Sequence, residues 1–344
     1  MPRPLQNPFR GPVRAAVVLA ALVLAVPVRA ADTVDMDAAH REGKVVWYTS
    51  LPIALAQKLS GLFEQQSGIK VELFRSGGSA ILRRFLQERD AGRVLADVLY
   101  TADPAATASL AAKDTFVAFK PKNFDKIADV AKDPQGRYYA LRLNMITLFV
   151  RTDQVAPADV PKSWSDLADA KYKGRLVIAD PSFTAVQVAV VGTLAKKLGW
   201  TYYEGLRRND IMVVPGNQQL ADMLKRGERL IAVGGLDSYA FDARKEGHKI
   251  ASIVPADGGF AVPGPVAVLK GSPNPNAAKA FAEFLISDEV QQIVVAGGAY
   301  SARTDLPPPA GDIALKDLKL LAVDYDQIEK DASAIKKKFN EVFQ

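Results

Sequence analysis

Short apolar runs alternate with helix-forming stretches from residue 44 onward, and this alternation constrains the fold more than any other feature. Residues 44–49 and 70–74 are rich in β-branched and aromatic side chains, as buried strands are. Between them, residues 52–67 carry apolar side chains at helical spacing and are followed by Gly68, a frequent helix terminator. Strands that alternate with helices are typical of layered α/β proteins, so we predict an α/β fold.

The alternation continues to the C-terminal end without an internal repeat or a long low-complexity linker. A length of 344 residues suggests about two domains. Since no linker separates two halves, we expect the chain to cross between two lobes more than once. The other predicted strands are 96–100, 140–150, 176–179, 211–214 and 230–233, and the other predicted helices are 80–91, one starting at Pro104, 184–198, 218–226, 275–287, 288–296 and 325–343.

The first 31 residues have the three-part layout of a secretory signal peptide. Three arginines within the first 14 residues precede an apolar run over residues 15–27, and two alanines close the segment. The run is shorter than the ~20 apolar residues that a membrane-spanning helix needs. We therefore predict a signal peptide over residues 1–31, cleavage near Ala30, and a soluble mature protein outside the cytosol.

The chain contains no cysteine, so we expect neither a lipid anchor nor a disulfide bond. The whole sequence has a net charge of +6 and a pI near 9.2. Four of its 44 basic residues and none of its 38 acidic residues lie in the predicted signal peptide, which leaves a nearly neutral mature chain. No basic stripe with interleaved aromatic residues is present, so nucleic acid is not an expected partner.

The sequence lacks the usual motifs of catalysis. Its two histidines, His40 and His248, stand beside charged residues and are expected on the surface. It contains no Gly-x-Ser-x-Gly elbow, phosphate-binding loop or dinucleotide fingerprint. We assign no catalytic residue and no cofactor, and an exported enzyme is the weaker alternative from another functional class.

Small polar residues recur just after predicted strands, where helices begin. Helix N-termini expose unpaired N–H groups and a partial positive charge, so several of them around one crevice form an anion site. In open α/β sheets that crevice lies at the carboxyl ends of the strands. Ordinary helix capping explains the presence of each of these residues taken singly. Their recurrence after several strands favours a ligand-binding site. The residues are Ser50, Ser76, Gly77, Gly78, Ser79, Thr101, Asp103, Ser182 and Thr184.

The order of these segments resembles the periplasmic substrate-binding proteins of ABC importers, in the branch named for ferric-iron-binding proteins. The matching segments are residues 45–52 (VVWYTSLP), 74–103, 161–182, 232–247 and 258–292. The resemblance implies a two-lobed type II fold, in which each lobe is a mixed sheet flanked by helices and a hinge of crossing strands joins the lobes. Lobe 1 would comprise residues 32–142 and 258–305, and lobe 2 residues 143–257 and 306–344.

The resemblance also implies how such a protein works. The ligand would lie in the cleft between the lobes, and the partners would be a permease and an ATPase of the bacterial inner membrane. Ligand bound to both lobes would favour the closed form. We expect a monomer that diffuses in the periplasm.

The resemblance leaves two main ligand classes open. Ferric-binding relatives use clustered tyrosines, whereas Tyr48, Tyr100 and Tyr239 alone make a small set for a ferric ion here. Other relatives bind phosphorylated or carboxylated organic molecules with hydroxyl groups and helix N-termini, and we prefer a small organic anion. Ferric iron, or a thiamine-like or polyamine-like ligand, is the alternative. The predicted contacts comprise the nine residues after the strands together with Tyr48, Arg142, Asn144, Asp237 and Tyr239.

Overall fold

The computed structural model describes residues 1–2 and 33–344. The predicted signal peptide therefore lies, apart from its first two residues, outside the described part of the chain. No helix among the described residues is both long and apolar enough to cross a membrane.

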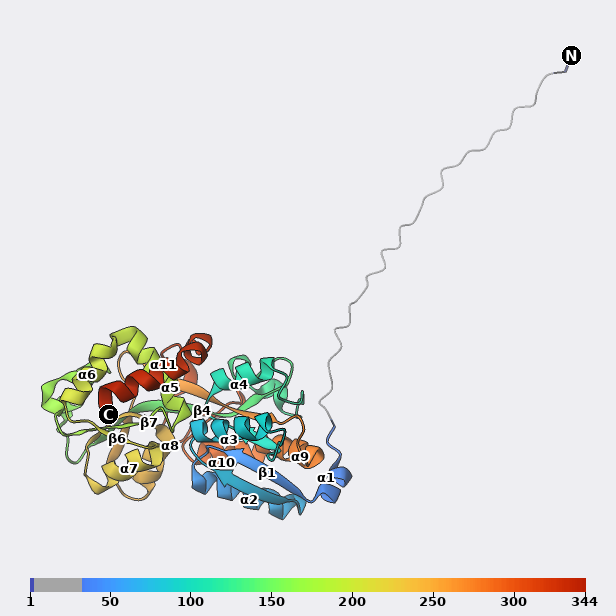
Figure 1. Ribbon diagram of the computed structural model, residues 1–344, viewed down its shortest axis with the longest axis horizontal. Coiled ribbons are helices and arrows are strands. Elements are labelled where there is room, and N and C mark those ends of the chain that lie inside the picture. The colour runs from blue at the N-terminus through green and yellow to red at the C-terminus, as the bar shows by residue number, and fades with distance from the viewer. Residues whose placement is uncertain (3–32) are drawn as a thin grey trace. The chain divides into compact units, whose positions relative to one another are not determined.

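The described chain is an α/β structure built on one mixed sheet (Figure 1). Its strands follow the order β2-β1-β3-β9-β4-β7-β5-β6, and β8 and β10 also pair with β4. The β1–β2, β1–β3, β5–β6 and β5–β7 pairs are parallel, whereas every pair that involves β4 or β9 is antiparallel. The strands are β1 Lys44–Thr49, β2 Lys70–Arg75, β3 Val98–Tyr100, β4 Tyr139–Arg151, β5 Leu176–Ala179, β6 Met212–Val214, β7 Ile231–Leu236, β8 Ile250–Ile253, β9 Phe260–Val268 and β10 Tyr300–Ser301.

Eleven α-helices accompany this sheet in the described residues. The α/β alternation predicted from the sequence is confirmed, and the last helix has the predicted bounds with Ile328, Ile335 and Phe339 buried on one face. The helices are α1 Met36–Glu42, α2 Ile53–Ser67, α3 Gly78–Asp90, α4 Pro104–Ala112, α5 Ala185–Leu198, α6 Trp200–Arg208, α7 Asn217–Arg226, α8 Asp237–Lys245, α9 Pro275–Leu285, α10 Asp288–Ala296 and α11 Tyr325–Phe343.

Strand β9 was not predicted, and its sequence explains why. Its run FAVPGPVAV contains Pro263 and Pro265, which lack the N–H group that a central strand donates. Both prolines nevertheless lie in the sheet, where Pro263 pairs with Leu143 and Pro265 with Ala140 of β4. Tertiary pairing with β3 and β4 thus overrides the local signal. Helices α1, α6 and α8 and strands β8 and β10 were also missed.

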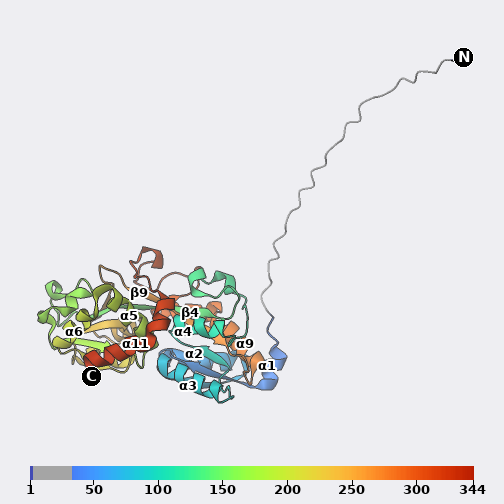
Figure 2. The ribbon, with the colours of Figure 1, turned by 45° about the horizontal axis from the view of Figure 1, so that its top comes forward.

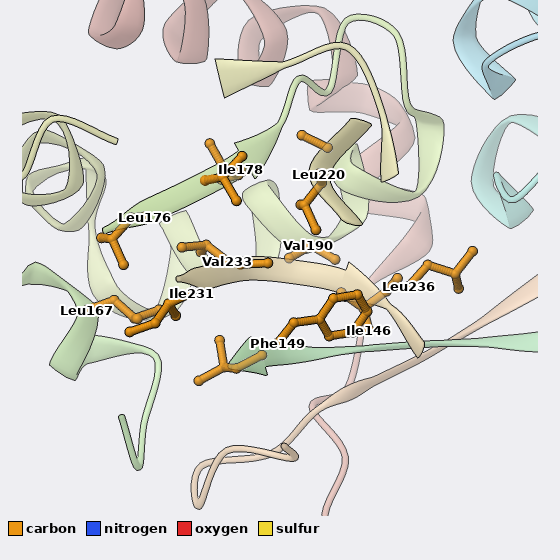
Figure 3. Close-up of a cluster of buried hydrophobic side chains, with 14 of the residues drawn as sticks. Ile146, Phe149, Leu167, Leu176, Ile178, Val190, Leu220, Ile231, Val233 and Leu236 are labelled. Carbon is orange, nitrogen blue, oxygen red and sulfur yellow. The ribbon is translucent and has the colours of Figure 1, made fainter. Parts of the chain in front are cut away.

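The buried apolar side chains form separate cores. One core, shown in part in Figure 3, includes Ile178 of β5, Val190 of α5 and Val233 of β7, together with one face of α11. A second core joins β1, α2 and α9, and a smaller cluster packs α3 against β1 and β3.

Strands β4 and β9 are the elements that pass from one core to the other (Figure 2). Along β4, residues up to Met145 pack in the second core and residues from Ile146 pack in the first. Along β9, Phe260 and Val262 pack in the first core, and Val266 and Val268 pack in the second. The predicted segment boundary at 142/143 lies within β4, and the one at 257/258 lies just before β9. The division into two named lobes stays a prediction.

Candidate functional site

A cavity of about 310 Å³ lies where loops that follow six strands converge. We call its two sides the first wall and the second wall, and Asn144 of β4 also lines it. The first wall consists of Ser50, Leu51, Pro52, Arg75, Ser76, Gly77, Gly78, Ala80, Tyr100 and Ala102. The second wall consists of Phe183, Thr184, Ala185, Val186, Pro215, Gly216, Asn217, Gln218, Gln219, Leu236 and Tyr239.

The first wall follows from the parallel pairing of β1, β2 and β3. The carboxyl ends of parallel strands meet at one edge, so Ser50, Arg75 and Tyr100 arrive there together. Arg75 is exposed and donates from Nε to the Leu51 carbonyl oxygen at 2.9 Å, which orients its guanidinium beside the cavity. It is the single charged side chain among the described residues that line the cavity.

The second wall is built in the same way at the ends of β5, β6 and β7. The β5–α5 loop supplies Phe183 and Thr184, and the β6–α7 loop supplies Pro215 to Gln219. The Thr184 hydroxyl donates to the Pro215 carbonyl oxygen at 3.0 Å, which ties the two loops together. The side chains of this wall are hydroxyls, carboxamides and apolar groups.

Four helices begin at the cavity with neither a side-chain cap nor an acidic residue in the first turn, whereas a fifth, α8, begins there uncapped at Leu236 but carries Asp237 in its first turn. The N-cap residues of α2, α3, α5 and α7 are Pro52, Gly77, Thr184 and Gly216, and none accepts a hydrogen bond through its side chain from the first turn. The first N–H groups of a helix have no partner inside the helix. These four starts therefore present unpaired donors and a partial positive charge to the cavity.

The two walls touch at one rim of the cavity. A Cβ atom on Gly77 would lie 2.2 Å from the Phe183 carbonyl oxygen, and one on Gly78 would lie 2.8 Å from the Ala185 Cβ. Beside this contact, Ser79 Oγ donates to the Pro181 carbonyl oxygen at 3.4 Å. The glycine pair thus permits the start of α3 to approach the backbone that precedes α5.

Several buried polar atoms at the cavity lack a hydrogen-bond partner within the described chain. They are the hydroxyls of Ser50 and Tyr100 and Oδ1 of Asn217. Tyr100 is 1% exposed and Asn217 is 8% exposed. A buried polar atom without a partner costs roughly 1–3 kcal/mol, so these atoms are poised to meet a ligand or water.

A buried guanidinium stands behind this surface. Arg142 is buried, and it donates to Asn144 Oδ1 at 3.1 Å and to Ser238 Oγ at 3.3 Å, both uncharged acceptors. Its charge lowers the pKa values of Tyr100 and Tyr239, but burial has the larger effect and raises both. The two phenols are therefore neutral hydroxyls in the neutral pH range.

Seven of the fourteen predicted contact residues line the cavity, and seven do not. Those that line it are Ser50, Ser76, Gly77, Gly78, Asn144, Thr184 and Tyr239. Those that do not are Tyr48, Ser79, Thr101, Asp103, Arg142, Ser182 and Asp237.

Most of the seven absent residues have structural partners instead. Tyr48 packs against Phe74 and donates to Glu88 at 2.9 Å, and burial raises its pKa to about 12. Asp103 caps α4 by accepting from the Ala106 N–H. Thr101 and Ser79 are buried, and the backbone of Ser182 is engaged by Asp180 and Arg83.

Asp237 has no such clear role. It lies in the first turn of α8, is buried, and its Oδ1 lacks a partner within the described chain. Burial raises its pKa to about 6, although a hydrogen bond with the Ser252 side chain and the charges of Arg244 and Arg142 act in the opposite direction. It stands behind the second wall rather than in it.

The sequence reasoning missed Arg75 and the loop from Pro215 to Gln219. The loop could have been found, because it follows a predicted strand and carries a glycine at a helix start, as residues 76–79 do. Arg75 gave no such signal, since an arginine at the end of an edge strand is usually solvated. Its placement depends on the Leu51 carbonyl, a tertiary contact.

The described residues contain no cluster of three or more His, Cys, Asp or Glu side chains suited to a metal ion. The tyrosines that were predicted for ferric iron are divided in the structure. Tyr100 and Tyr239 line the cavity, whereas Tyr48 does not.

Comparison with known proteins agrees with the fold. The family model of the bacterial extracellular solute-binding proteins matches residues 94–331. A Salmonella typhimurium protein with the provisional name 2-aminoethylphosphonate-binding periplasmic protein is 26% identical over 316 residues, or 87% of this chain and 88% of that one.

Two solved structures cover 88% of this chain. The periplasmic binding protein AfuA from Actinobacillus pleuropneumoniae, with fructose-6-phosphate bound, has a TM-score of 0.78 at 24% identity over 98% of its length. Iron-bound HitA from Pseudomonas aeruginosa has a TM-score of 0.74 at 20% identity over 99% of its length. The predicted fold class, a two-lobed type II periplasmic-binding-protein fold, is confirmed.

Proposed function

The chain belongs to the bacterial extracellular solute-binding proteins, as its sequence predicted, and from that premise we propose that it captures a small organic anion for an ABC importer. The anion carries a phosphate, phosphonate or carboxylate group. The ligand binds in the cavity between the first and second walls, and the protein delivers it unchanged to a permease and its ATPase in the inner membrane.

The convergence of four uncapped helix starts on one cavity carries this proposal. Their unpaired N–H groups provide donors for anionic oxygens without any metal. Arg75 adds a full positive charge on the first wall, and Ser50, Ser76 and Thr184 add hydroxyl groups. Apart from Arg75, the cavity-lining side chains of the described chain are uncharged, so an anion meets no opposing charge there.

The contact between Gly77 and Phe183 supports closure around the ligand. Two walls that rest on different cores can separate by bending β4 and β9, the strands that pass between the cores. A ligand that contacts both walls binds the closed form more tightly and shifts the population toward it. The importer would then recognise the closed form of a periplasmic monomer.

Ferric iron is the second candidate, because Tyr100 and Tyr239 both line the cavity. A ferric ion prefers several anionic oxygen ligands, and two phenols beside Arg75 provide few of them. An anion bound together with the metal would have to complete the coordination. A tyrosinate-bound ferric ion would colour the protein red to orange, so the absorption spectrum after addition of ferric citrate separates the two candidates.

Thermal-shift screening tests the proposal directly. The purified mature protein is screened against phosphate esters, phosphonates and carboxylates, with neutral sugars, polyamines and ferric citrate as the other arms. A ligand present at one hundred times its Kd stabilises the folded state by about 2.7 kcal/mol. We expect stabilisation by phosphate esters or phosphonates. Stabilisation by neutral sugars, polyamines or ferric ion alone would contradict the proposal.

A final measurement separates a binding protein from an exported enzyme. The ligand identified in the screen is incubated with the protein and recovered after denaturation. We expect mass spectrometry to return it unchanged, whereas catalytic turnover would place the chain in the enzyme class.

A further inference from the structure

We propose that the ligand of this cavity is a phosphorylated or phosphonylated compound whose remaining part carries hydroxyl groups and no ammonium group. This inference rests on the proposed function and refines it. It separates hydroxylated anions from zwitterions such as aminoalkylphosphonates, which carry the same anionic group.

The charged side chain that lines the cavity in the described chain is positive. Four helix N-termini, each with a partial positive charge, and the guanidinium of Arg75 surround it. Arg142, bonded to the cavity-lining Asn144, adds a second full positive charge behind Tyr100 and Tyr239. On Tyr239 the effects of Arg75 and Arg142 are each larger than the opposite effects of Asp242 and Asp222. A ligand ammonium group would therefore meet a net repulsion.

The carboxylates near the walls in sequence accept hydrogen bonds from the protein. Asp103 accepts from the Ala106 N–H at 3.0 Å, Asp180 from the Ser182 N–H at 2.7 Å, and Asp222 from Nε2 of the cavity-lining Gln218 at 3.0 Å. Asp237 lies behind the second wall without lining the cavity. No aspartate or glutamate is among the described residues that line the cavity, so an ammonium group would lose its hydration without an ion pair in return.

The uncharged polar atoms suit hydroxyl groups instead. Asn217 Oδ1 is an acceptor that is more than nine-tenths buried and has no partner within the part of the chain that the structure describes. The buried Tyr100 hydroxyl, beside the Asn144 side chain, both donates and accepts. A sugar or polyol hydroxyl also donates and accepts, so it satisfies both atoms. Leu236 and Phe183 provide apolar surface for the carbon skeleton.

The cavity volume agrees with a small ligand of this kind. About 310 Å³ is at the lower end of the range for pockets that bind small molecules, roughly 300–1,000 Å³. A triose, pentose or hexose phosphate has few enough atoms to fit this space. A nucleotide or a larger conjugate would extend past the contact between Gly77 and Phe183.

Three phosphonates that differ at one position provide the test. Isothermal titration of the mature protein compares ethylphosphonate, 2-hydroxyethylphosphonate and 2-aminoethylphosphonate, with fructose 6-phosphate as a larger hydroxylated probe. We expect 2-hydroxyethylphosphonate to bind at least as tightly as ethylphosphonate. We expect 2-aminoethylphosphonate to bind roughly tenfold or more weakly than ethylphosphonate, because its ammonium group is repelled.

A charge placed on the second wall should reverse this preference. Asn217→Asp puts a carboxylate at nearly the same shape, and Gln65→Glu on the exposed face of α2 makes the matched control. In Asn217→Asp we expect the affinity ratio of 2-aminoethylphosphonate to ethylphosphonate to rise at least tenfold, and in Gln65→Glu we expect no change. The ratio is read within one variant, so a general loss of anion affinity does not disturb it.

The outcomes are distinct. Equal or tighter binding of 2-aminoethylphosphonate by the unmodified protein overturns this inference and leaves the proposed organic-anion function standing. Failure of every phosphonate and phosphate ester to bind, while a carboxylate binds, also overturns this inference alone. Failure of every organic anion to bind overturns the proposed function, and the refinement with it. An unchanged ratio in Asn217→Asp also counts against the inference, because the repulsion would then not arise at this cavity.

Discussion

Helices that begin at the cavity differ from helices that begin elsewhere in the molecule. Helices α1, α4, α10 and α11 start with N-cap residues that do not line the cavity, namely Asp35, Asp103, Ser287 and Asp324, and the side chains of these residues accept from the first turn. At the cavity, α2, α3, α5 and α7 start at residues whose side chains make no such bond. Capping typically contributes about 1 kcal/mol, so the cavity helices forgo stability where a ligand can supply the acceptor.

The helices outside these two groups limit the rule. The first turn of α9 is capped from another helix, because Glu42 accepts from the N–H groups of Asn276 and Ala277. Helix α6 also begins without a side-chain cap, at Gly199, which does not line the cavity, and α8 begins uncapped at the cavity-lining Leu236 with Asp237 in its first turn. A missing cap alone therefore does not mark a site. Several uncapped helix starts around one cavity, together with an arginine, do mark a candidate ligand site.

The largest expected effect comes from adding a side chain at Gly77, where the start of α3 contacts the backbone of Phe183. Gly77→Ala would place a Cβ atom 2.2 Å from the Phe183 carbonyl oxygen, so the walls must move apart. We expect ligand affinity to fall by roughly tenfold to hundredfold, since such overpacking costs about 1–3 kcal/mol in the closed form. Titration calorimetry with the ligand found in the screen measures it.

A glycine with free space around it gives the matched control. Gly61 lies inside α2 with nothing within 4 Å of its Cβ position, so Gly61→Ala should leave affinity unchanged. It should also stabilise the protein by about 0.5–1 kcal/mol, because alanine is the better helix former. An unchanged affinity in Gly77→Ala would show that ligand binding does not need this contact between the walls.

The second effect comes from Arg75, the one charged side chain among the described residues that line the cavity. Arg75→Gln removes the guanidinium but keeps a hydrogen-bond donor, and we expect roughly tenfold to hundredfold weaker anion binding. Arg89→Gln, at the other end of α3 beside Asp90, is the control with unchanged affinity. If affinity and its dependence on salt concentration survive Arg75→Gln, the helix starts alone bind the anion.

The third effect uses a capping carboxylate, Asp103, that does not line the cavity. Burial raises the pKa of Asp103 to about 6, even though the Ala106 N–H lowers it; Glu329 of α11 raises it further and Lys336 lowers it. The protonated form is favoured in the folded state, so its contribution to stability is present below about pH 4. It is lost as the pH rises through about 6.

We therefore expect Asp103→Asn to flatten this part of the stability curve. Denaturant unfolding of both proteins between pH 4 and 7 should show the variant gaining on the unmodified chain by on the order of 1 kcal/mol toward pH 7. Asp237, whose pKa is also about 6, contributes with the same sign in both proteins and cancels in the difference. A difference that stays constant with pH would mean that Asp103 titrates normally.

The sequence predicted the secondary structure and fold of the molecule better than the residues that line its cavity. The strand and helix alternation gave the fold because each signal is local, as in α11, where the spacing of Ile328, Ile335 and Phe339 marks the buried face. The local signal could not predict β9, because Pro263 and Pro265 disfavour a strand. What holds β9 in the sheet is its pairing with β4, whose residues are distant in the sequence.

The same limit applies to the site. Ser50 and residues 76–78 were predicted because a polar residue or glycine after a strand is visible in the sequence. Thr101 and Asp103 fit the same rule, yet the buried Thr101 hydroxyl lies 3.5 Å from the Thr107 hydroxyl and Asp103 caps α4. The rule locates the ends of strands but does not say which side of the loop faces the cavity. That choice depends on tertiary packing.

The smallest expected effect completes the comparison of helix starts. Ser287→Ala removes the acceptor for the Val290 N–H at the start of α10, so we expect about 1 kcal/mol less stability and unchanged ligand affinity. Thr184→Ala at the start of α5 should behave in the opposite way. The Thr184 hydroxyl makes no cap, and it lines the cavity while donating to Pro215, so affinity should fall more than stability. Chemical denaturation and calorimetry on the two variants measure both quantities. Equal losses of stability without any loss of affinity would remove the distinction between structural and ligand-facing helix starts.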